Sequence, residues 1–279
     1  MLPVHGFAKT AEEVRKLQLL PEPKEVRMGD GSFRVDGETK IVVQLGHQAE
    51  DRIAAETLVE EVEQQSGMRL EIATAMQAGR KGREIVLARL DDGKWQKFLE
   101  SQGLKADTIG DQGYLLFADK SRIVVGARTG QGLFYGVQTL RQLLRPEGHE
   151  MVCPSVFIRD WPSMEWRGVQ DDISRGPIPT MDFMKKQIRT LAAYKVNLFG
   201  LYMEHVFDFE AHPLIAPKEA ALTPERVRDL VGYASRDHVT VLPEQQTFGH
   251  LHNVLKYEIY SDVAERPHGH VLTPAKEAS

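Results

Sequence analysis

The sequence has a single cysteine, no long apolar run and no cluster of like charges. Cys153 has no partner for an internal disulfide, so the fold has to be held by its core. Basic residues are interleaved with acidic ones at a net charge of −5, which excludes the basic surfaces that bind nucleic acid. No stretch approaches the ~20 apolar residues of a membrane span, and residues 1–13 lack the pattern of a secretion signal. Neither nucleic acid nor a membrane is therefore a predicted partner. The sequence does not determine the cellular compartment.

What the sequence does contain is an ordinary globular composition, 42% apolar and 27% charged over 279 residues, which predicts about two domains. Residues 1–20 are interpreted as a leader, with one helical stretch over 11–20. Residues 21–152 alternate strands and helices and predict a small α+β domain. Its predicted strands are 32–35, 40–45, 68–72, 84–90, 113–118 and 122–126, and its predicted helices are 49–65, 95–102 and 130–144.

A second predicted domain, residues 153–279, has a different rhythm after a linker at Trp161-Pro162. Thr223 is the predicted N-cap of one of its helices, with Pro224 in the first turn, where a missing N–H costs nothing. The alternation of apolar strands with helices indicates a parallel sheet covered by helices. The predicted strands are 165–173, 196–203 and 239–243, with a helix over 181–194 between the first two.

Three glycines after a strand, Gly126, Gly130 and Gly132, open the predicted helix 130–144. This context is typical of a dinucleotide-binding loop, in which glycines let the backbone approach a pyrophosphate. The motif lies late in its domain, however, and no acidic residue ends a following parallel strand to hold a ribose. We therefore favour a tight turn with close packing of helix on strand, and no cofactor is predicted.

Polar residues gather where each apolar strand of the second domain ends. The chemistry of parallel α/β folds lies beyond the carboxyl ends of the strands, which makes these residues site candidates. Each candidate can also be explained without a functional role. Adjacent aspartates on a strand point to opposite faces, and one of them can cap a loop. The Glu-His pair can be a solvated pair on the surface. The candidates are Asp171, Asp172, Glu204, His205, Glu244 and His250.

Arg167 lies early in the first of these strands, where a buried guanidinium needs an acid or a ligand as its partner. A structural ion pair is the alternative to a binding role. His250-x-His252 and His268-x-His270 have spacings that suit a metal, but no third ligand of clear spacing accompanies them. Solvated loop histidines are favoured, and no metal is predicted.

Several of these segments match the motifs of one family. Trp166-Arg167-Gly168 with Asp172-Ile173-Ser174-Arg175 resembles the first barrel strand of glycoside hydrolase family 20, the β-N-acetylhexosaminidases. Tyr194–Asn197 resembles its entry to the second strand, and Pro243-Glu244 through Gly249-His250 resembles its third. Upstream, Gly132–Leu140 is similar to the helix of the small domain that precedes the family's barrel. The resemblance covers about residues 20–270.

The resemblance implies an α/β protein with a small α+β N-terminal domain followed by a (β/α)8 TIM-type barrel. It also implies a retaining hydrolase of terminal β-linked N-acetylglucosamine or N-acetylgalactosamine, whose nucleophile is the substrate's own acetamido oxygen. In that family an Asp orients the acetamido group and the neighbouring Glu is the general acid and base. By position, Arg167 would bind sugar hydroxyls, and His250 would support the site.

The sequence also departs from the family. Tyr202-Met203-Glu204-His205-Val206 stands where the family has a His-x-x-Asp-Asp run, and no Asp-Glu dipeptide occurs in the 279 residues. A barrel takes about 250 residues, and fewer than half as many follow Trp161. We therefore expect a divergent, truncated member with about three βα units of an incomplete barrel and no catalytic residue of its own. The alternatives are a family 84-like O-GlcNAc hydrolase or a non-catalytic carbohydrate-binding module.

Overall fold

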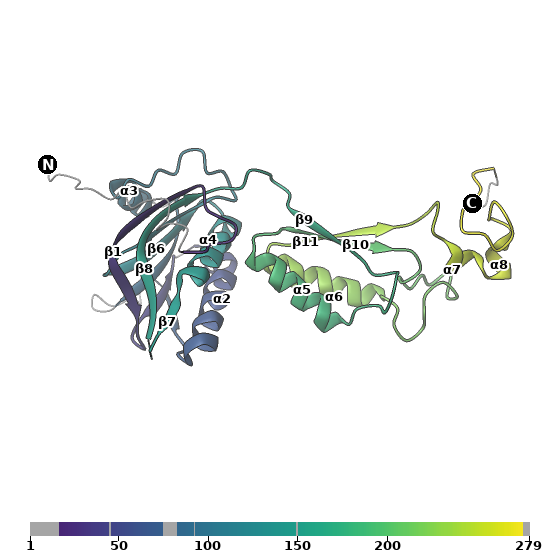
Figure 1. Cartoon of the computed structure of the whole chain (residues 1–279), viewed down its shortest axis with the longest axis horizontal. Coiled ribbons are helices and arrows are strands. Elements are labelled where there is room, and N and C mark those ends of the chain that lie inside the picture. The colour runs from purple at the N-terminus through teal and green to yellow at the C-terminus, as the bar shows by residue number, and fades with distance from the viewer. Residues whose placement is uncertain (1–16, 45, 75–82, 92, 149, 276–279) are drawn as a thin grey trace. The chain divides into compact units, whose positions relative to one another are not determined.

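The structure is a computed structural model that describes residues 17–44, 46–74, 83–91, 93–148 and 150–275. The chain forms two compact units, Met1–Glu165 and Trp166–Ser279 (Figure 1). Residues 11–16 of the predicted helix over 11–20 lie outside the described residues, and residues 17–20 are not helical. The chain divides between residues 165 and 166, whereas the predicted boundary at 152/153 lies within a strand of the first unit.

The first unit is built on one mixed eight-stranded sheet. Its order is β1-β8-β5-β6-β4-β2-β3, with β7 paired to β8. The half from β6 to β3 is parallel, whereas β1, β8, β5 and β6 pair antiparallel. The strands are β1 (Glu25–Val35), β2 (Lys40–Val43), β3 (Glu71–Thr74), β4 (Glu84–Arg89), β5 (Tyr114–Ala118), β6 (Arg122–Ala127), β7 (Arg145–Glu147) and β8 (Glu150–Asp160).

Helices cover both faces of this sheet. Helices α2 (Gln48–Ser66) and α4 (Gly130–Leu143) pack together, and α4 also packs on β5 and β6. Helix α3 (Gly93–Ser101) covers the opposite face, where its buried Leu99 joins a core cluster with Phe117 and Val124. Because side chains alternate along a strand, Val124 faces α3 while Val125 faces α4. The predicted mixture of strands and helices in this segment is confirmed.

The glycines that open α4 serve close packing. A Cβ on Gly132 would lie 2.5 Å from the carbonyl oxygen of Gly113, and one on Gly126 would lie 2.6 Å from Leu99. The side-chain oxygen of Thr129 caps the helix by accepting from the Gly132 N–H. A Cβ on Gly130 would lie 3.1 Å from the Arg89 guanidinium, which is closer than an ordinary van der Waals contact. The packing interpretation of these glycines is confirmed.

The second unit opens with strand, helix, strand, helix and strand in alternation. The strands pair parallel in the order β11-β10-β9, and α6 packs on α5 and on β11. Thr223 caps α6 by accepting from the Arg226 N–H, with Pro224 in the first turn, as predicted. The elements are β9 (Gly168–Asp172), α5 (Met181–Ala193), β10 (Leu198–Met203), α6 (Pro224–Arg236), β11 (Thr240–Gln245), α7 (His252–Leu255) and α8 (Glu258–Ser261).

One face of this three-stranded sheet is open. On β10, Phe199, Leu201 and Met203 are buried, whereas Tyr202 on the opposite face is only half-buried. Leu242 of β11 is 49% exposed, and β9 is exposed along most of its length. The described residues contain three parallel strands of the fold rather than a closed barrel.

We expect two glycine-to-alanine substitutions to act in opposite directions. Gly132→Ala is expected to lower the free energy of unfolding by about 1–3 kcal/mol, because its Cβ would press on a backbone carbonyl. Gly232→Ala, in the middle of α6 with open space around it, is expected to raise it by up to about 1 kcal/mol. Urea unfolding of each variant measures both. An unchanged midpoint for Gly132→Ala contradicts the packing argument.

Candidate active site

The candidate site lies at the carboxyl ends of the three parallel strands of the second unit. Asp172, Tyr202 and Glu244 are partners in one row across β9, β10 and β11. Neighbours in a parallel row point to the same side of the sheet, so these three side chains share the open face. Asp171 points the other way, and its carboxylate accepts from Gln187 of α5 at 2.9 Å. The expectation that the two adjacent aspartates lie on opposite faces is confirmed.

Glu204 is the hub of the site. It is 8% exposed, although it directly follows the end of β10. Its Oε1 accepts from the Tyr202 hydroxyl at 3.1 Å, and it lies 3.5 Å from Nη2 of Arg175 and 4.0 Å from Nδ1 of His250. Its backbone N–H donates to Oγ of Ser174 at 2.7 Å. A carboxylate held by neighbours from β10 and from the loops after β9 and β11 is a fixed negative charge beside the open face.

Arg175 ties the ends of β9 and β10 together. Its Nε lies 3.1 Å from the Asp172 carboxylate, and its guanidinium carbon lies 6.0 Å from the centre of the Tyr202 ring. The hydrogen bond to Tyr202, followed by the charges of Asp172 and Glu204, raises the pKa of Arg175. Burial and the bond to Glu204 raise the pKa of the Tyr202 hydroxyl, which therefore stays protonated. Neither residue was a candidate from the sequence, although the Asp172-x-x-Arg175 spacing is a signal for a local ion pair.

Glu244 lies at the outer edge of the site. It is exposed, and its carboxylate accepts a hydrogen bond from the Gln170 side chain across the open face. Gln170 is therefore a third residue that the sequence reasoning missed. Gln170 and Glu244 lie on the two outer strands, and β10 lies between them. There Gly200, the register partner of Gln170, has no side chain and leaves room for the contact. A glycine in the middle strand lets polar side chains meet over it.

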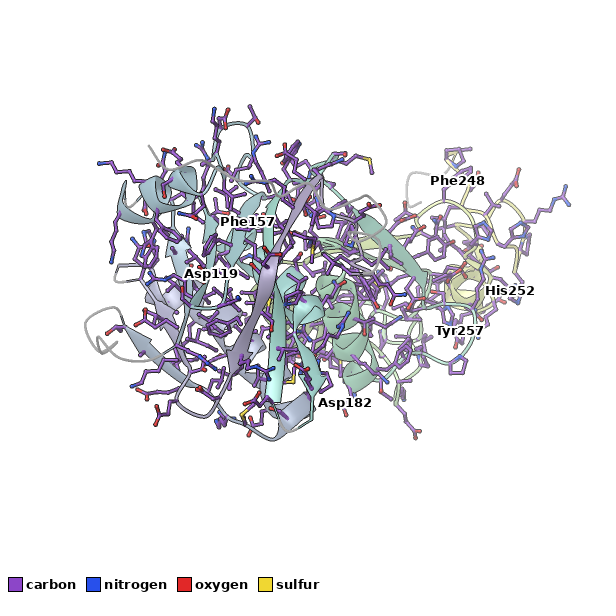
Figure 2. The ribbon with its side chains drawn as sticks, turned by 60° about the vertical axis from the view of Figure 1, so that its left-hand side comes forward. Asp119, Phe157, Asp182, Phe248, His252 and Tyr257 are labelled. Atoms are coloured by element: carbon purple, nitrogen blue, oxygen red, sulfur yellow. The ribbon has the colours of Figure 1, made fainter. Side chains whose placement is uncertain are left out.

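The loop after β11 carries Phe248 and His250, and α7 begins at His252, with Tyr257 after its end; Figure 2 labels Phe248, His252 and Tyr257. His250 has a left-handed backbone (φ 59°), and its side chain is 61% exposed and directed to Glu204. His205 follows Glu204 in the chain and is half-buried, with Nδ1 3.4 Å from the side-chain amide of Asn253. The structure therefore brings Glu204, His205 and His250 together, as it does Asp172 and Glu244.

Acid is expected to destabilise the second unit through His205. Burial, with a smaller contribution from Lys256, lowers the pKa of His205 against the opposing effect of Glu204. The neutral ring is favoured in the folded state, so its contribution is complete above about pH 6.5 and is lost as the pH falls through the lowered folded pKa. Unfolding measured at about pH 7.5 and about pH 5 should show a smaller acid-induced loss for His205→Gln. His212→Gln, at an exposed site, should behave like the parent; equal losses in all three proteins would contradict the argument.

Arg167 lies apart from this group, at the opposite end of β9. Its backbone N–H donates to the Asn197 side chain at 2.8 Å, and its Nε donates to the Lys195 carbonyl at 2.9 Å. Both partners belong to the turn that enters β10, so the sheet separates Arg167 from Glu204 and His250. The predicted strand began at residue 165, whereas β9 begins at Gly168, which leaves Arg167 before the strand. Its binding role stays a prediction.

The second histidine pair lies on a segment beside the first, because the Leu251 N–H donates to the His270 carbonyl at 2.9 Å. The His268 side chain lies 3.4 Å from the Glu258 carboxylate and 3.2 Å from the Lys256 carbonyl. Across the described ranges, no group of three or more His, Cys, Asp or Glu side chains is arranged to hold a metal ion. Nor does any helix in those ranges have the length and apolarity to cross a membrane.

Two family models match the chain in succession. Residues 16–161 match glycosyl hydrolase family 20, domain 2, and residues 164–273 match the catalytic domain of the same family. The two matches follow the division into compact units. The chain belongs to glycosyl hydrolase family 20. The resemblance inferred from the motifs is confirmed, and the family 84 alternative is disfavoured.

The relatives of this family 20 chain that are described below all carry the name of a hexosaminidase. It is 26% identical over 260 residues to a β-hexosaminidase of Porphyromonas gingivalis, covering 84% of this chain and 30% of the relative. It is 25% identical over 271 residues to a β-hexosaminidase of Vibrio furnissii, covering 88% and 40%. The solved N-acetyl-β-hexosaminidase of Streptomyces plicatus shares the fold, with a TM-score of 0.75 and 23% identity over 94% of this chain and 54% of that one. The chain thus spans less than half the length of these two curated relatives.

Proposed function

We propose that this chain forms part of a β-N-acetylhexosaminidase, which removes terminal β-linked N-acetylglucosamine or N-acetylgalactosamine from glycans. The observation that carries the proposal is the polar cluster around Glu204, placed at the carboxyl ends of three parallel strands in a family 20 chain. That edge is where α/β barrels hold their substrates. A buried carboxylate with three polar side chains around it suits a ligand that is rich in hydroxyl groups.

The proposed chemistry is substrate-assisted hydrolysis with retention of configuration, in which the acetamido oxygen of the sugar attacks its own anomeric carbon. In this scheme the protein orients the sugar and supplies an acid for the leaving oxygen. Asp172 and Glu244 offer acceptors on the open face. Glu204 would fix His250 and Arg175 around the sugar, and His205 would back Glu204 from the half-buried side.

The acid itself is the part that these residues do not supply. The resemblance implies an Asp-Glu pair after the next strand, and the 279 residues contain no such dipeptide. A general acid has to lie within hydrogen-bond reach of the oxygen that it protonates. We therefore propose that the chain by itself binds the sugar weakly and does not cleave it.

Hydrolysis of p-nitrophenyl N-acetyl-β-glucosaminide and its galactosaminide analogue tests the proposal. The 279-residue chain is expected to release no nitrophenol, because it lacks the acid, whereas the full-length product of its gene is expected to hydrolyse at least one of the two. Turnover by the 279-residue chain would overturn the assignment of the acid to another segment. A full-length product that binds N-acetylglucosamine without cleaving either substrate would favour a non-catalytic carbohydrate-binding role.

A matched pair of variants in the full-length product tests the site. Glu204→Gln keeps the shape and removes the charge that faces Arg175 and His250, so kcat/KM is expected to fall roughly 100-fold through misplacement of the sugar. Glu225→Gln removes a carboxylate from the exposed first turn of α6 and is expected to leave kcat/KM unchanged. Equal effects of the two would place the hub elsewhere.

A further inference from the structure

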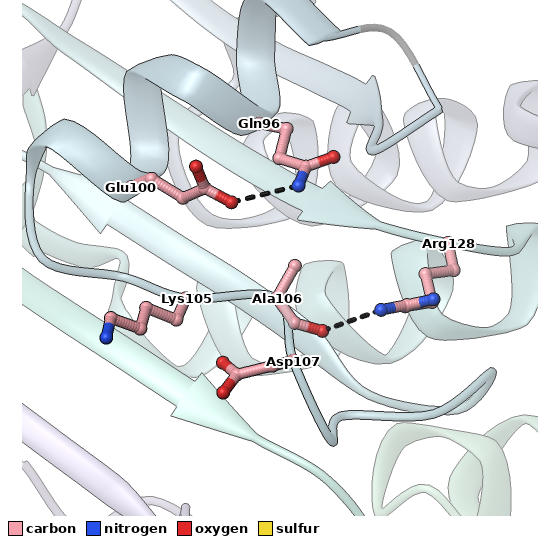
Figure 3. Close-up of a pocket in the computed structure, with 6 residues that line it drawn as sticks. All are labelled: Gln96, Glu100, Lys105, Ala106, Asp107 and Arg128. Carbon is pink, nitrogen blue, oxygen red and sulfur yellow. Dashed lines mark hydrogen bonds between the residues drawn. The ribbon is translucent and has the colours of Figure 1, made fainter.

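A second polar depression lies in the first unit, on the face covered by α3 (Figure 3). Its volume is about 410 Å³, which lies within the range of small-molecule sites. Helix α3, the loop that follows it and the residue after β6 all contribute to its wall. The lining residues are Gln96, Glu100, Lys105, Ala106, Asp107 and Arg128.

The loop of residues 102–108, which forms one wall, is held by three arginines from three separate elements. Arg27 of β1 donates to the Gln102 carbonyl at 3.1 Å. Arg128 donates to the Ala106 carbonyl at 3.0 Å. Arg159 of β8 donates to the Lys105 carbonyl at 2.9 Å and to the Asp107 carbonyl at 2.6 Å. Four carbonyls of a short surface loop therefore have charged donors anchored in the sheet.

The same loop holds costly backbone conformations. Thr108 has a φ of 66°, a left-handed conformation that is uncommon for a non-glycine residue, and its Oγ1 accepts from Arg159 at 2.7 Å. Gly103 is also left-handed, at a φ of 80°. Backbone of this kind persists when its surroundings fix it, and it is concentrated at binding and catalytic sites. A wall fixed before a ligand arrives loses little entropy on binding.

The charged groups that line the depression are balanced. Two carboxylates, Glu100 and Asp107, and two cations, Lys105 and Arg128, contribute to the lining, so their formal charges cancel. Gln96 donates to Glu100 at 2.9 Å and adds an amide oxygen of its own. The aliphatic parts of these side chains and Ala106 add apolar surface between the charges. An isolated anion or cation would meet a repelling partner here, whereas a neutral ligand with both polar and C–H groups would not.

We propose that this depression binds a neutral saccharide unit. Each hydroxyl group of a sugar both donates and accepts, so one ring can satisfy the carboxylates and the cations of the lining at once. The inference does not rest on the proposed activity, because all six residues lie in the first unit. A free monosaccharide and the end of a glycan chain share this chemistry, and ligands of two lengths distinguish them.

Amide NMR spectra of the ¹⁵N-labelled chain test the proposal, with N-acetylglucosamine, its β-1,4-linked trimer and sulfate as ligands. Saturable shifts of the Gln96, Lys105 and Ala106 amides are expected with either sugar, and tighter binding of the trimer would indicate a glycan end. Lys105→Ala is expected to weaken binding about threefold to tenfold through the loss of a donor. Lys97→Ala makes the same charge change on the exposed side of α3 and is expected to leave the affinity unchanged.

Three results would overturn the proposal: no saturable shift with either sugar, shifts with sulfate alone, or equal weakening by the two lysine variants. The amides of Glu204 and His250 report the second unit in the same spectra. If a sugar shifts the amides of the second unit but not that of Lys105, the site in the first unit is contradicted and the proposed function is not. Shifts at Lys105 that persist in Glu204→Gln would support this site whatever becomes of the other.

Discussion

Asp51→Ala is expected to lower the free energy of unfolding of the first unit by about 3–5 kcal/mol, because it leaves a buried arginine without its buried partner. Asp51, in the first turn of α2, is fully buried, and Arg89 at the end of β4 is 4% exposed. Nε of Arg89 donates to both carboxylate oxygens, at 2.9 and 3.2 Å. The pair joins a helix to the centre of the parallel half of the sheet. Urea or thermal unfolding measures the loss.

Glu50→Ala is the matched control for this prediction. Glu50 binds the same guanidinium at 2.6 Å, but its side chain is 68% exposed, so its removal is expected to cost at most about 1 kcal/mol. The double variant Asp51→Ala, Arg89→Met removes the charge that Asp51→Ala strands, and it is expected to recover most of the lost stability. A double variant no more stable than Asp51→Ala would show that packing of α2, and not the stranded charge, sets the loss.

The thiol of Cys153 is expected to react at least about a thousandfold more slowly in the folded protein than in the unfolded chain. Burial raises the pKa of Cys153 to about 12. The fraction of the thiol present as thiolate is therefore about a thousandfold smaller in the folded protein than in the unfolded chain. The thiolate is the reactive form, and Cys153 is also closed off inside β8 at 0% exposure. Labelling with Ellman's reagent at about pH 8, with and without denaturant, gives the ratio of rates.

An exposed thiol supplies the control for this labelling. In a Cys153→Ala background, Ser101→Cys places a thiol at the exposed end of α3, where it is expected to react at the rate of a free peptide thiol in both conditions. Rapid stoichiometric labelling of native Cys153 would mean that β8 separates from its neighbours far more often than a core strand should.

The sequence predicts the helices and the inner strands of this protein better than its outer strands. Periodicity locates α4 and α5 to within a residue, and the Thr223 cap locates the start of α6. The first half of β1 and most of β8 were not predicted. The segment Gly29–Gly31 is typical of a turn, and Pro154 is typical of the end of a strand. In the structure the glycines form a bulge inside β1, and Pro154 lies opposite Ser32 directly beside it. A proline without an N–H is tolerated next to such an irregularity.

The site was predictable as far as chain order determines it. The rule that chemistry follows the ends of parallel strands selects Asp172, Glu204 and Glu244, and the structure places them at one edge. The roles of Arg175 and Tyr202 depend on the register between β9 and β10, which the sequence does not reveal. The place of Arg167 depends on where β9 begins: the predicted strand 165–173 includes it, whereas β9 starts at Gly168 and leaves it just before the strand.

The pairing of β1 with β8 has a consequence for the order in which the first unit can be assembled. Glu25 and Arg159, which form an ion pair across these two strands, are 134 residues apart in the sequence. Elements from β5 to α4 lie close together in the chain and can form as soon as they emerge from the ribosome. Strand β1 emerges early and then has to wait, unpaired, until β8 has been synthesised. During that interval its exposed edge is open to other chains, so slow translation between residues 35 and 150 leaves the protein vulnerable to aggregation.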